Sequence, residues 1–179
     1  MKPHNEEKTI QPHLLYEGRV IDVYRDEVEL PNGEPAIREY VAHRGGAAIL
    51  PIDEDGNVYL VRQFRYPYRT ELLEIPAGKL EAGEDASEAA RRELEEETGW
   101  ICDNLRPYGV LYPSPGYTNE HLYIYLAEDL KKGHVHLDAD EFVNVEVLPF
   151  DEVVRMVTDN TITDAKTCYA VLRYLADHR

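Results

Sequence analysis

The segment from residue 78 to residue 100 crowds glutamates into five consecutive positions, at Glu93, Glu95, Glu96 and Glu97. Asp85 is a suitable N-cap with Glu88 three residues further on, and Gly99 is a natural stop, so a helix is predicted between them. Residues three and four apart share a helix face, where like charges destabilise the helix. The helix dipole also disfavours negative charge in the last turn. A divalent cation bound by carboxylate oxygens would relieve both penalties.

A solvated acidic helix face is the alternative interpretation of this run. The spacing of the residues argues against it. The segment resembles the Nudix box, whose pattern is Gly, five residues, Glu, seven residues, Arg-Glu, an aliphatic residue, any residue, Glu-Glu, any residue, Gly and a bulky apolar residue. The matching positions are Gly78, Glu84, Arg92, Glu93, Leu94, Glu96, Glu97, Gly99 and Trp100. Seven fixed identities at set spacings rarely coincide by chance.

The resemblance implies a loop, a helix and a second loop, in which the helix supplies metal ligands to a substrate diphosphate. Glu93 and Glu97 would bind the metal directly, and Glu96 would bind or support a second ion. The carbonyl oxygen of Ala77 would complete the site. Mg²⁺ is the implied ion, and Mn²⁺ is expected to substitute for it. Metal ions suit this chemistry because they withdraw charge from the diphosphate oxygens and activate water.

Arg92 and Glu84 have a different implied role. They would pair with each other and orient the catalytic helix, without touching the reacting phosphorus. Gly78 and Gly99 are structural positions of the same motif.

Other segments are similar to the ADP-ribose pyrophosphatase branch of the family, over residues 17–174. These segments are residues 18–23, 61–65, 74–78, 114–116 and 140–143. Pro115 lies about fifteen residues after the box, a placement associated with ADP-ribose hydrolysis, although a Pro-Gly loop is also ordinary turn chemistry. The implied reaction is Mg²⁺-dependent hydrolysis of ADP-ribose to AMP and ribose 5-phosphate.

Three residues outside the box are candidates for contact with water or substrate. Glu141 matches a catalytic glutamate that positions the attacking water in this branch, and Asp140 could take that role instead. Arg65 matches an arginine that grips a substrate phosphate, with a surface salt bridge as the alternative. Glu120 could hydrogen-bond a ribose hydroxyl or hold a metal.

The branch also implies a homodimer that exchanges an N-terminal β-sheet between subunits. Arg44 would then reach a phosphate in the neighbouring subunit. Tyr24 and Tyr40 could stack on the adenine, but aromatic residues on strands are more often core or cross-strand pairs. The residues His134 and His136 have metal-compatible spacing, yet in a polar loop such a pair usually indicates a solvated segment.

The acidic composition restricts the class of partner. The 19 Lys and Arg residues against 35 Asp and Glu residues give a net charge of −16, which repels polyanions. Nucleic acid is therefore not an expected partner. A small nucleoside diphosphate derivative is compatible, because metal ions and local arginines reverse the potential inside a pocket. The sequence shows no signal peptide and no transmembrane stretch, so we expect a cytoplasmic protein without a membrane partner.

The remaining pattern predicts strands on both sides of the helix. Residues 14–41 alternate as a hairpin, residues 47–52 and 58–64 as a second strand pair, and residues 71–75 as a short strand. Further strands are expected at residues 108–112, 121–127 and 143–148. Two helices close the chain at residues 150–157 and 164–177, the second with Cys168, Val171, Leu172 and Leu175 on one face. Cys102 and Cys168 are expected to be buried thiols rather than a disulfide framework.

These elements predict an α/β fold, a Nudix-type α/β/α sandwich with a mixed β-sheet plus an N-terminal antiparallel β-hairpin region. We expect a partly ordered lead-in at residues 1–13 that forms no folded element, a dimerising β-sheet region at 14–45 and the Nudix hydrolase domain at 46–179. Two alternatives stay open for function. One is the same chemistry on another nucleotide sugar or a dinucleotide polyphosphate, and the other is a catalytically silent Nudix domain that senses a ligand. Three repelling carboxylates count against the silent domain, since binding alone does not need them.

Overall fold

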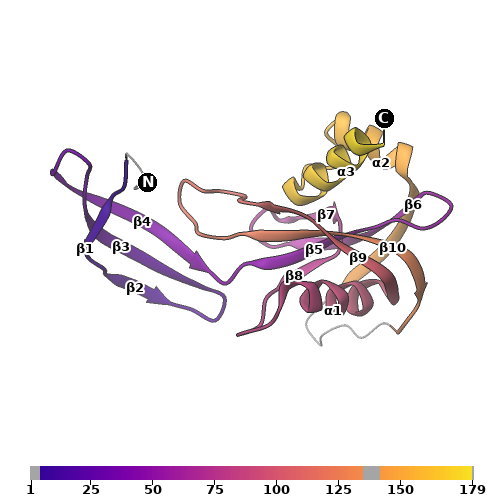
Figure 1. Ribbon diagram of the computed structural model, residues 1–179, viewed down its shortest axis with the longest axis horizontal. Helices are drawn as coiled ribbons and strands as arrows, with labels where there is room; N and C mark the ends of the chain where they lie inside the picture. The colour runs from indigo at the N-terminus through magenta and orange to yellow at the C-terminus, as the bar shows by residue number, and fades with distance from the viewer. Residues whose placement is uncertain (1–4, 135–141, 179) are drawn as a thin grey trace. The chain divides into compact units, whose positions relative to one another are not determined.

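The computed structural model describes residues 5–134 and 142–178. The chain divides into two compact units. One unit comprises Met1–Gly45 and Ser114–Glu120, and the other comprises Gly46–Pro113 and His121–Arg179. Each unit has its own β-sheet structure (Figure 1).

The first unit is a four-stranded antiparallel sheet. Its centre is the hairpin of β3 (Ile21–Glu29) and β4 (Pro35–His43), which confirms the hairpin predicted from the alternating pattern. Two short strands, β1 (Lys8–Gln11) and β2 (Leu14–Glu17), also pair with β3. Between these two strands the His13 N–H donates to Oδ1 of the buried Asp26 at 3.0 Å. A side chain therefore replaces a ladder hydrogen bond where the edge is interrupted.

Strand β1 corrects the expectation that residues 1–13 contain no folded element. All four of its side chains are exposed. The strand is held by backbone pairing with Glu27–Glu29 rather than by burial. Polar side chains are compatible with such an edge strand, so the polarity of residues 8–11 does not exclude a strand there.

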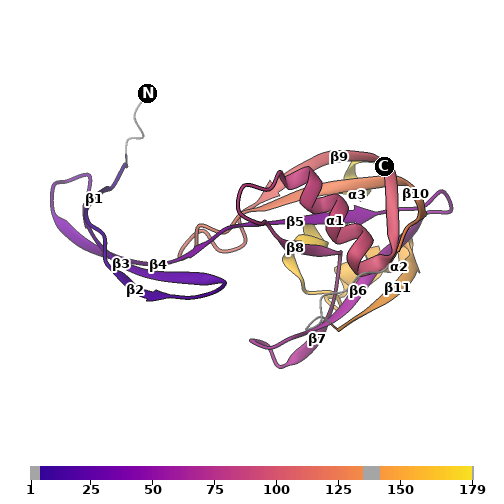
Figure 2. The same cartoon turned by 90° about the horizontal axis from the view of Figure 1, so that it is seen from below.

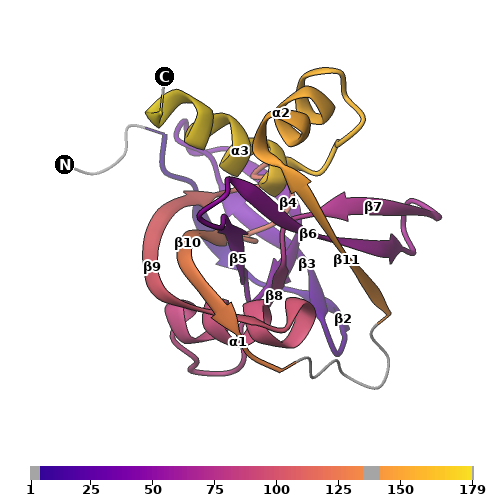
Figure 3. The same ribbon diagram turned by 90° about the vertical axis from the view of Figure 1, so that its right-hand side faces the viewer.

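The second unit places two sheets between helices. One sheet has the order β8 (Ala77–Lys79), β5 (Gly46–Pro51), β10 (Leu122–Lys132) and β9 (Trp100–Leu111), and the other has the order β11 (Val143–Pro149), β6 (Asn57–Arg65) and β7 (Thr70–Glu74). Strands β5 and β10 are parallel and the other pairs are antiparallel, as expected for mixed pairing. Helix α1 (Ala86–Thr98) lies on one side, and α2 (Phe150–Thr158) and α3 (Ala165–Asp177) lie on the other (Figure 3). This arrangement confirms the predicted α/β/α order.

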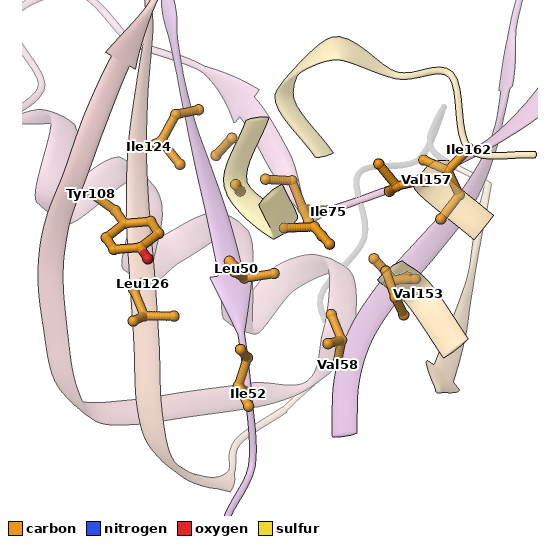
Figure 4. Packing of buried hydrophobic residues seen from close by; sticks show 14 of the residues in the cluster. Leu50, Ile52, Val58, Ile75, Tyr108, Ile124, Leu126, Val153, Val157 and Ile162 are labelled. Carbon is orange, nitrogen blue, oxygen red and sulfur yellow. The ribbon is translucent and has the colours of Figure 1, made fainter. Parts of the chain in front are cut away.

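Strand β5 lies at the centre of this unit, and every one of its residues is buried. Ala47 and Ile49 belong to the apolar cluster formed with α1, whereas Ala48 and Leu50 belong to the cluster formed with α2 and α3. The alternation follows from the period of two in a strand. A strand covered on both faces has a continuous apolar sequence, as this one does. Figure 4 shows the second cluster around Leu50 and Ile75.

The expected strand pair between residues 47–52 and 58–64 is wrong. Within the described part of the chain, β5 and β6 are not paired, and the only bridge between these two segments joins Ile52, the residue after β5, to Val58. The edges of β5 are occupied by β8 and β10, and those of β6 by β7 and β11. The turn itself is real, because the Asp53 carboxylate accepts the Asp55 and Asn57 amides. Turn chemistry fixed where the chain reverses, while packing decided the pairing.

Helix α3 buries a different face from the one predicted. Its buried residues are Lys166, Thr167, Ala170 and Val171. Leu172 is 44% exposed and Cys168 is partly buried. Of the two free thiols, only Cys102 is as buried as expected. None of the helices in the described residues has the length and apolar character needed to cross a membrane, and the cytoplasmic location stays a prediction.

Candidate active site

Helix α1 carries the glutamate-rich motif and is capped at both ends. The Asp85 side chain accepts the Ser87 N–H at 2.8 Å. At the other end Gly99 adopts a left-handed conformation with φ of 73° and donates its N–H to the Glu95 carbonyl at 2.8 Å. This conformation favours glycine. Both predicted ends are confirmed, and the helix packs on β5, β8 and β9 (Figure 2) through Ala89, Ala90 and Leu94.

Two of the predicted metal ligands are buried against the backbone of β8. Glu97 is 3% exposed, and its Oε2 accepts the Ala77 N–H at 3.0 Å. Glu93 is 6% exposed, and a Cβ built on Gly78 would lie 1.7 Å from its Oε1. The absence of a side chain at Gly78 is therefore what lets the carboxylate approach the backbone. The structure brings these four predicted residues together.

Arg92 lies among three carboxylates. Its Nε donates to Glu84 Oε1 at 3.0 Å, and its Nη1 donates to Glu93 Oε1 at 2.7 Å and to Glu96 Oε2 at 2.8 Å. The predicted pairing with Glu84 is confirmed. The hydrogen bond with Glu84 raises the pKa of Arg92, and the same contact lowers the pKa of Glu84. The contacts to Glu93 and Glu96 were not anticipated, and they offset part of the repulsion expected along this helix.

The donor chemistry of this cluster fits a hard divalent cation. Glu93 and Glu97 contribute buried carboxylate oxygens, and Glu96 is linked to Glu93 through Arg92. Such oxygens are the ligands that Mg²⁺ and Ca²⁺ prefer, and buried carboxylates need compensating positive charge. Within residues 5–134 and 142–178, no group of three or more His, Cys, Asp or Glu side chains is already gathered as a metal site. The three-carboxylate site therefore stays a prediction.

A second charged cluster surrounds Glu74, at the end of β7. Glu74 is 1% exposed and accepts two hydrogen bonds from Arg65, from Nε to Oε1 and from Nη2 to Oε2, both at 2.7 Å. The ammonium of the buried Lys166 also contacts Glu74 Oε2. Burial acts to raise the pKa of Glu74, but the hydrogen bonds from Arg65 and the charge of Lys166 outweigh it and lower the pKa.

The salt bridge considered for Arg65 thus involves a buried partner rather than a surface one. The Arg65 side chain is 37% exposed. Glu74 is the main cause of the raised pKa of Arg65, and the charge of Glu97 also contributes, so Arg65 lies within electrostatic reach of α1. Sequence reasoning missed Glu74 and Lys166 as site-forming residues. The available signal was a glutamate inside the apolar run of residues 72–75.

Three predicted substrate residues belong to the first unit. The loop Ser114–Glu120 is bound to β4, since the His43 N–H donates to Asn119 Oδ1 at 2.8 Å. Arg44 and Pro115 are exposed, and Glu120 is partly buried with its Oε1 3.8 Å from His43 Nδ1. Their contacts with substrate stay predictions.

Tyr24 and Tyr40 are opposite each other in the β3–β4 register. Their rings are stacked, with centroids 5.1 Å apart and planes 9° apart. The structure therefore shows the cross-strand pair that was the alternative to adenine stacking.

The predicted water-positioning residues Glu141 and Asp140, and also His136, lie outside the described residues. His134 is described, and its N–H donates to Glu95 Oε1 at 3.2 Å. That contact holds the chain beside the last turn of α1.

Comparison with known proteins identifies the class. The NUDIX domain matches residues 42–170, and the nucleoside diphosphate sugar hydrolase N-terminal domain matches residues 7–41. The chain belongs to the Nudix family of hydrolases, enzymes that generally use divalent metal ions.

Individual relatives are similar over nearly the whole chain. The chain is 43% identical over 168 residues to the ADP-ribose pyrophosphatase of Bacillus subtilis (strain 168), covering 93% of this chain and 91% of that one. It is 42% identical over 168 residues to the methanol dehydrogenase activator of Bacillus methanolicus, with the same coverage. A solved structure described as "Crystal structure of ADP compounds hydrolase" superimposes with a TM-score of 0.85 at 23% identity, covering 98% of this chain and 96% of that chain. The predicted Nudix-type fold is confirmed.

Proposed function

We propose that this chain hydrolyses the diphosphate bond of ADP-ribose to give AMP and ribose 5-phosphate. The observation that carries the proposal is the pair of buried carboxylates, Glu93 and Glu97, held against the backbone of Ala77 and Gly78. Burying two such charges one helical turn apart is costly, and Arg92 offsets part of that cost at Glu93 while a bound divalent cation would offset the rest. The name of the 43% identical relative and the position of Pro115 support ADP-ribose as the substrate.

We assign Mg²⁺ as the ion, with Mn²⁺ as a substitute. The carboxylates of Glu93 and Glu97 and the carbonyl of Ala77 would hold it, and Glu96 would serve a second ion. When bound, a divalent ion supplies positive charge to the diphosphate oxygens and to the attacking water. The chain's own part is to fix the oxygens beforehand, since the Ala77 N–H holds Glu97 while Arg92 holds Glu93 and Glu96.

Substrate contacts are proposed from the family positions. Arg65 would bind a phosphate, because Glu74 fixes its guanidinium plane with two of the five N–H donors and leaves others for phosphate oxygens. Glu141, with Asp140 as the alternative, would position the attacking water. The remaining substrate contacts are assigned to Arg44, Pro115 and Glu120.

We also propose a homodimer formed through the N-terminal sheet. The strands of this sheet expose several large apolar side chains, with 38% to 60% of each exposed, namely Ile10, Leu14, Leu15, Tyr16 and Ile37. Exposed apolar side chains gathered on one small sheet are typical of an interaction surface.

A substrate panel tests the proposed activity. The purified protein would be incubated with ADP-ribose, ADP-glucose, GDP-mannose and diadenosine polyphosphates, with and without Mg²⁺, while the nucleotide products are followed, such as AMP from ADP-ribose and GMP from GDP-mannose. We expect the highest kcat/KM for ADP-ribose and no turnover without a divalent ion. A higher kcat/KM for another compound would transfer the assignment to that substrate. Metal binding without hydrolysis of any compound would favour the silent ligand-sensing domain.

A further inference from the structure

The connection from Glu74 to Gly78 is anchored by side chains near both ends. The Ala77 N–H donates to Glu97 Oε2 of α1 at 3.0 Å. Two residues earlier, the buried Ile75 N–H donates to Thr167 Oγ1, in the first turn of α3, at 2.9 Å. Pro76 lies between these amides, and its ring fixes φ. A displacement of one anchor is therefore transmitted through a stiff link to the other.

The Thr167 hydroxyl is oriented by a second hydrogen bond. It donates to Asp164 Oδ2 at 2.6 Å, and the same carboxylate oxygen accepts the Thr167 N–H at 3.0 Å as the N-cap of α3. A hydroxyl has one proton to donate, so its lone pairs remain to accept the Ile75 amide. Thr167 is 0% exposed. Water therefore cannot readily replace this acceptor if the hydroxyl is removed.

The first turn of α3 also binds the side chain of Glu74, the residue before Ile75. The Lys166 ammonium contacts the Glu74 carboxylate and donates to Asp164 Oδ1 at 2.9 Å. Lys166 is 6% exposed, so this contact is shielded from solvent. The first turn of α3 therefore binds both the side chain of Glu74 and the backbone of Ile75. Helix α3 itself supplies none of the residues of the Nudix box.

We propose that Thr167 is a positioning residue for the metal site on α1. Through the Ile75 amide it sets the place of Ala77, and with it the place of the Glu97 carboxylate. Its effect on turnover rests on the proposed function, whereas its effect on the Ala77 amide and on metal affinity concerns the protein alone.

A matched pair of substitutions isolates the hydroxyl. Thr167→Val keeps the branched shape and removes the oxygen, and Thr167→Ser keeps the oxygen and removes the methyl group. Amide hydrogen exchange would be measured by NMR on the metal-free protein. The Ala77 exchange ratio is the exchange rate of the Ala77 amide divided by that of the Leu126 amide in β10. Mn²⁺ affinity would be measured by calorimetry without substrate. Val171→Ala, a buried position of the same helix, reports the effect of a general loss of stability.

The expected result separates the two variants at position 167. In Thr167→Val the Ala77 exchange ratio should rise about tenfold and the Kd for Mn²⁺ should weaken by about tenfold, the size typical of groups that orient metal ligands. Thr167→Ser should stay within about twofold of the wild type in both measurements. Val171→Ala should lower Tm without changing the Ala77 exchange ratio or the Kd for Mn²⁺.

Several outcomes would overturn the proposal. One is an Ala77 exchange ratio that does not change in Thr167→Val. Another is a raised Ala77 exchange ratio with an unchanged Kd for Mn²⁺. A third is that Thr167→Val and Val171→Ala change the exchange ratio and the Kd equally. A wild-type protein that binds no Mn²⁺ would overturn it together with the metal assignment. If the wild type binds Mn²⁺ but does not hydrolyse ADP-ribose, the proposed substrate fails, and exchange and affinity still decide the role of Thr167.

Discussion

At the residue scale, each buried carboxylate of this site is held in position by its hydrogen-bond and ion-pair partners. Glu97 accepts a hydrogen bond from the Ala77 amide, Glu93 accepts one from Arg92, and Glu74 is contacted by the two cations Arg65 and Lys166. Within the described part of the chain, every buried side-chain nitrogen or oxygen has a hydrogen-bond partner. A buried polar group without a partner would cost free energy, so these contacts fix the oxygens in place.

Glu97→Gln tests the charge of the metal-site carboxylate separately from its shape. The amide oxygen of Gln can still accept the Ala77 N–H, so Tm should remain close to the wild-type value. Loss of the negative charge should lower kcat for ADP-ribose by orders of magnitude. AMP release and thermal melting measure the two effects, with the exposed Glu54→Gln as a control expected to change neither. Full activity of Glu97→Gln would refute the metal-site assignment.

Gly78→Ala tests the close approach of Glu93 to the backbone. The new Cβ would lie 1.7 Å from Glu93 Oε1, so the carboxylate has to move. We expect at least about tenfold weaker Mn²⁺ binding and a loss of about 1–3 kcal/mol in the free energy of unfolding. Calorimetry and urea denaturation provide the measurements. Gly116→Ala, where an added Cβ meets no atom within 4 Å, should bind Mn²⁺ like the wild type.

At the scale of elements, the connection from β7 to β8 joins two helices that lie on opposite sides of the sheets. One end is bound by α3 and the other by α1. This role explains the buried polar start of α3, because Lys166 contacts Glu74 at the end of β7 and Thr167 accepts the N–H of Ile75, the next residue. An apolar stripe was expected there because helical periodicity does not reveal buried ion pairs.

Glu74→Gln tests how strongly the β7–α3 contact stabilises the fold. The substitution removes the buried carboxylate charge that Arg65 and Lys166 share and leaves Lys166 its contact with Asp164. We expect a loss of about 3–5 kcal/mol in the free energy of unfolding at neutral pH. The pKa of Glu74 in the folded state is lowered from its ordinary value of 4.5. The ionised carboxylate therefore stabilises the fold fully above that value, and this contribution is lost as pH falls through the lowered pKa.

The difference between wild type and Glu74→Gln should accordingly shrink on acidification. Urea denaturation at neutral pH and at a series of pH values below 4.5 measures it. A difference that stays constant with pH would contradict the ionised state assigned to Glu74.

The whole molecule combines two units with different surfaces. The second unit has two buried apolar clusters between its helices and sheets, whereas among the described residues of the first unit only Val28 is a buried apolar side chain. Large apolar side chains are exposed on both units, and in the first unit they lie on a single sheet and its loops. The absence of a nucleic-acid partner, expected from the net charge of −16 of the whole chain, stays a prediction. A second copy of the chain is the partner that we propose for the N-terminal sheet.

Leu15→Asp tests this dimer. Leu15 lies on β2 and is 60% exposed, so a charge there should disrupt an apolar interface without disturbing the core. Light scattering coupled to size exclusion should show twice the chain mass for the wild type and the chain mass for the variant. Leu172→Asp, at an exposed position of α3 in the second unit, should remain dimeric. A monomeric wild type at micromolar concentration would contradict the proposal.

The pairing of Arg92 with Glu84 was implied by the resemblance to the Nudix box. The sequence by itself determined the ends of α1, the spacing of its glutamates and the order of the layers, because caps, turns and apolar periodicity act over a few residues. The N-terminal hairpin was predictable for the same reason.

Only the tertiary structure decided how the strands of the second unit pair, which face of α3 is buried and which cations hold Glu74. Lys166 is 92 residues from Glu74 in sequence, and β5 and β6 separate into different sheets despite the turn between them. Strand edges and buried ion pairs are chosen by packing between distant segments, which local sequence signals do not report.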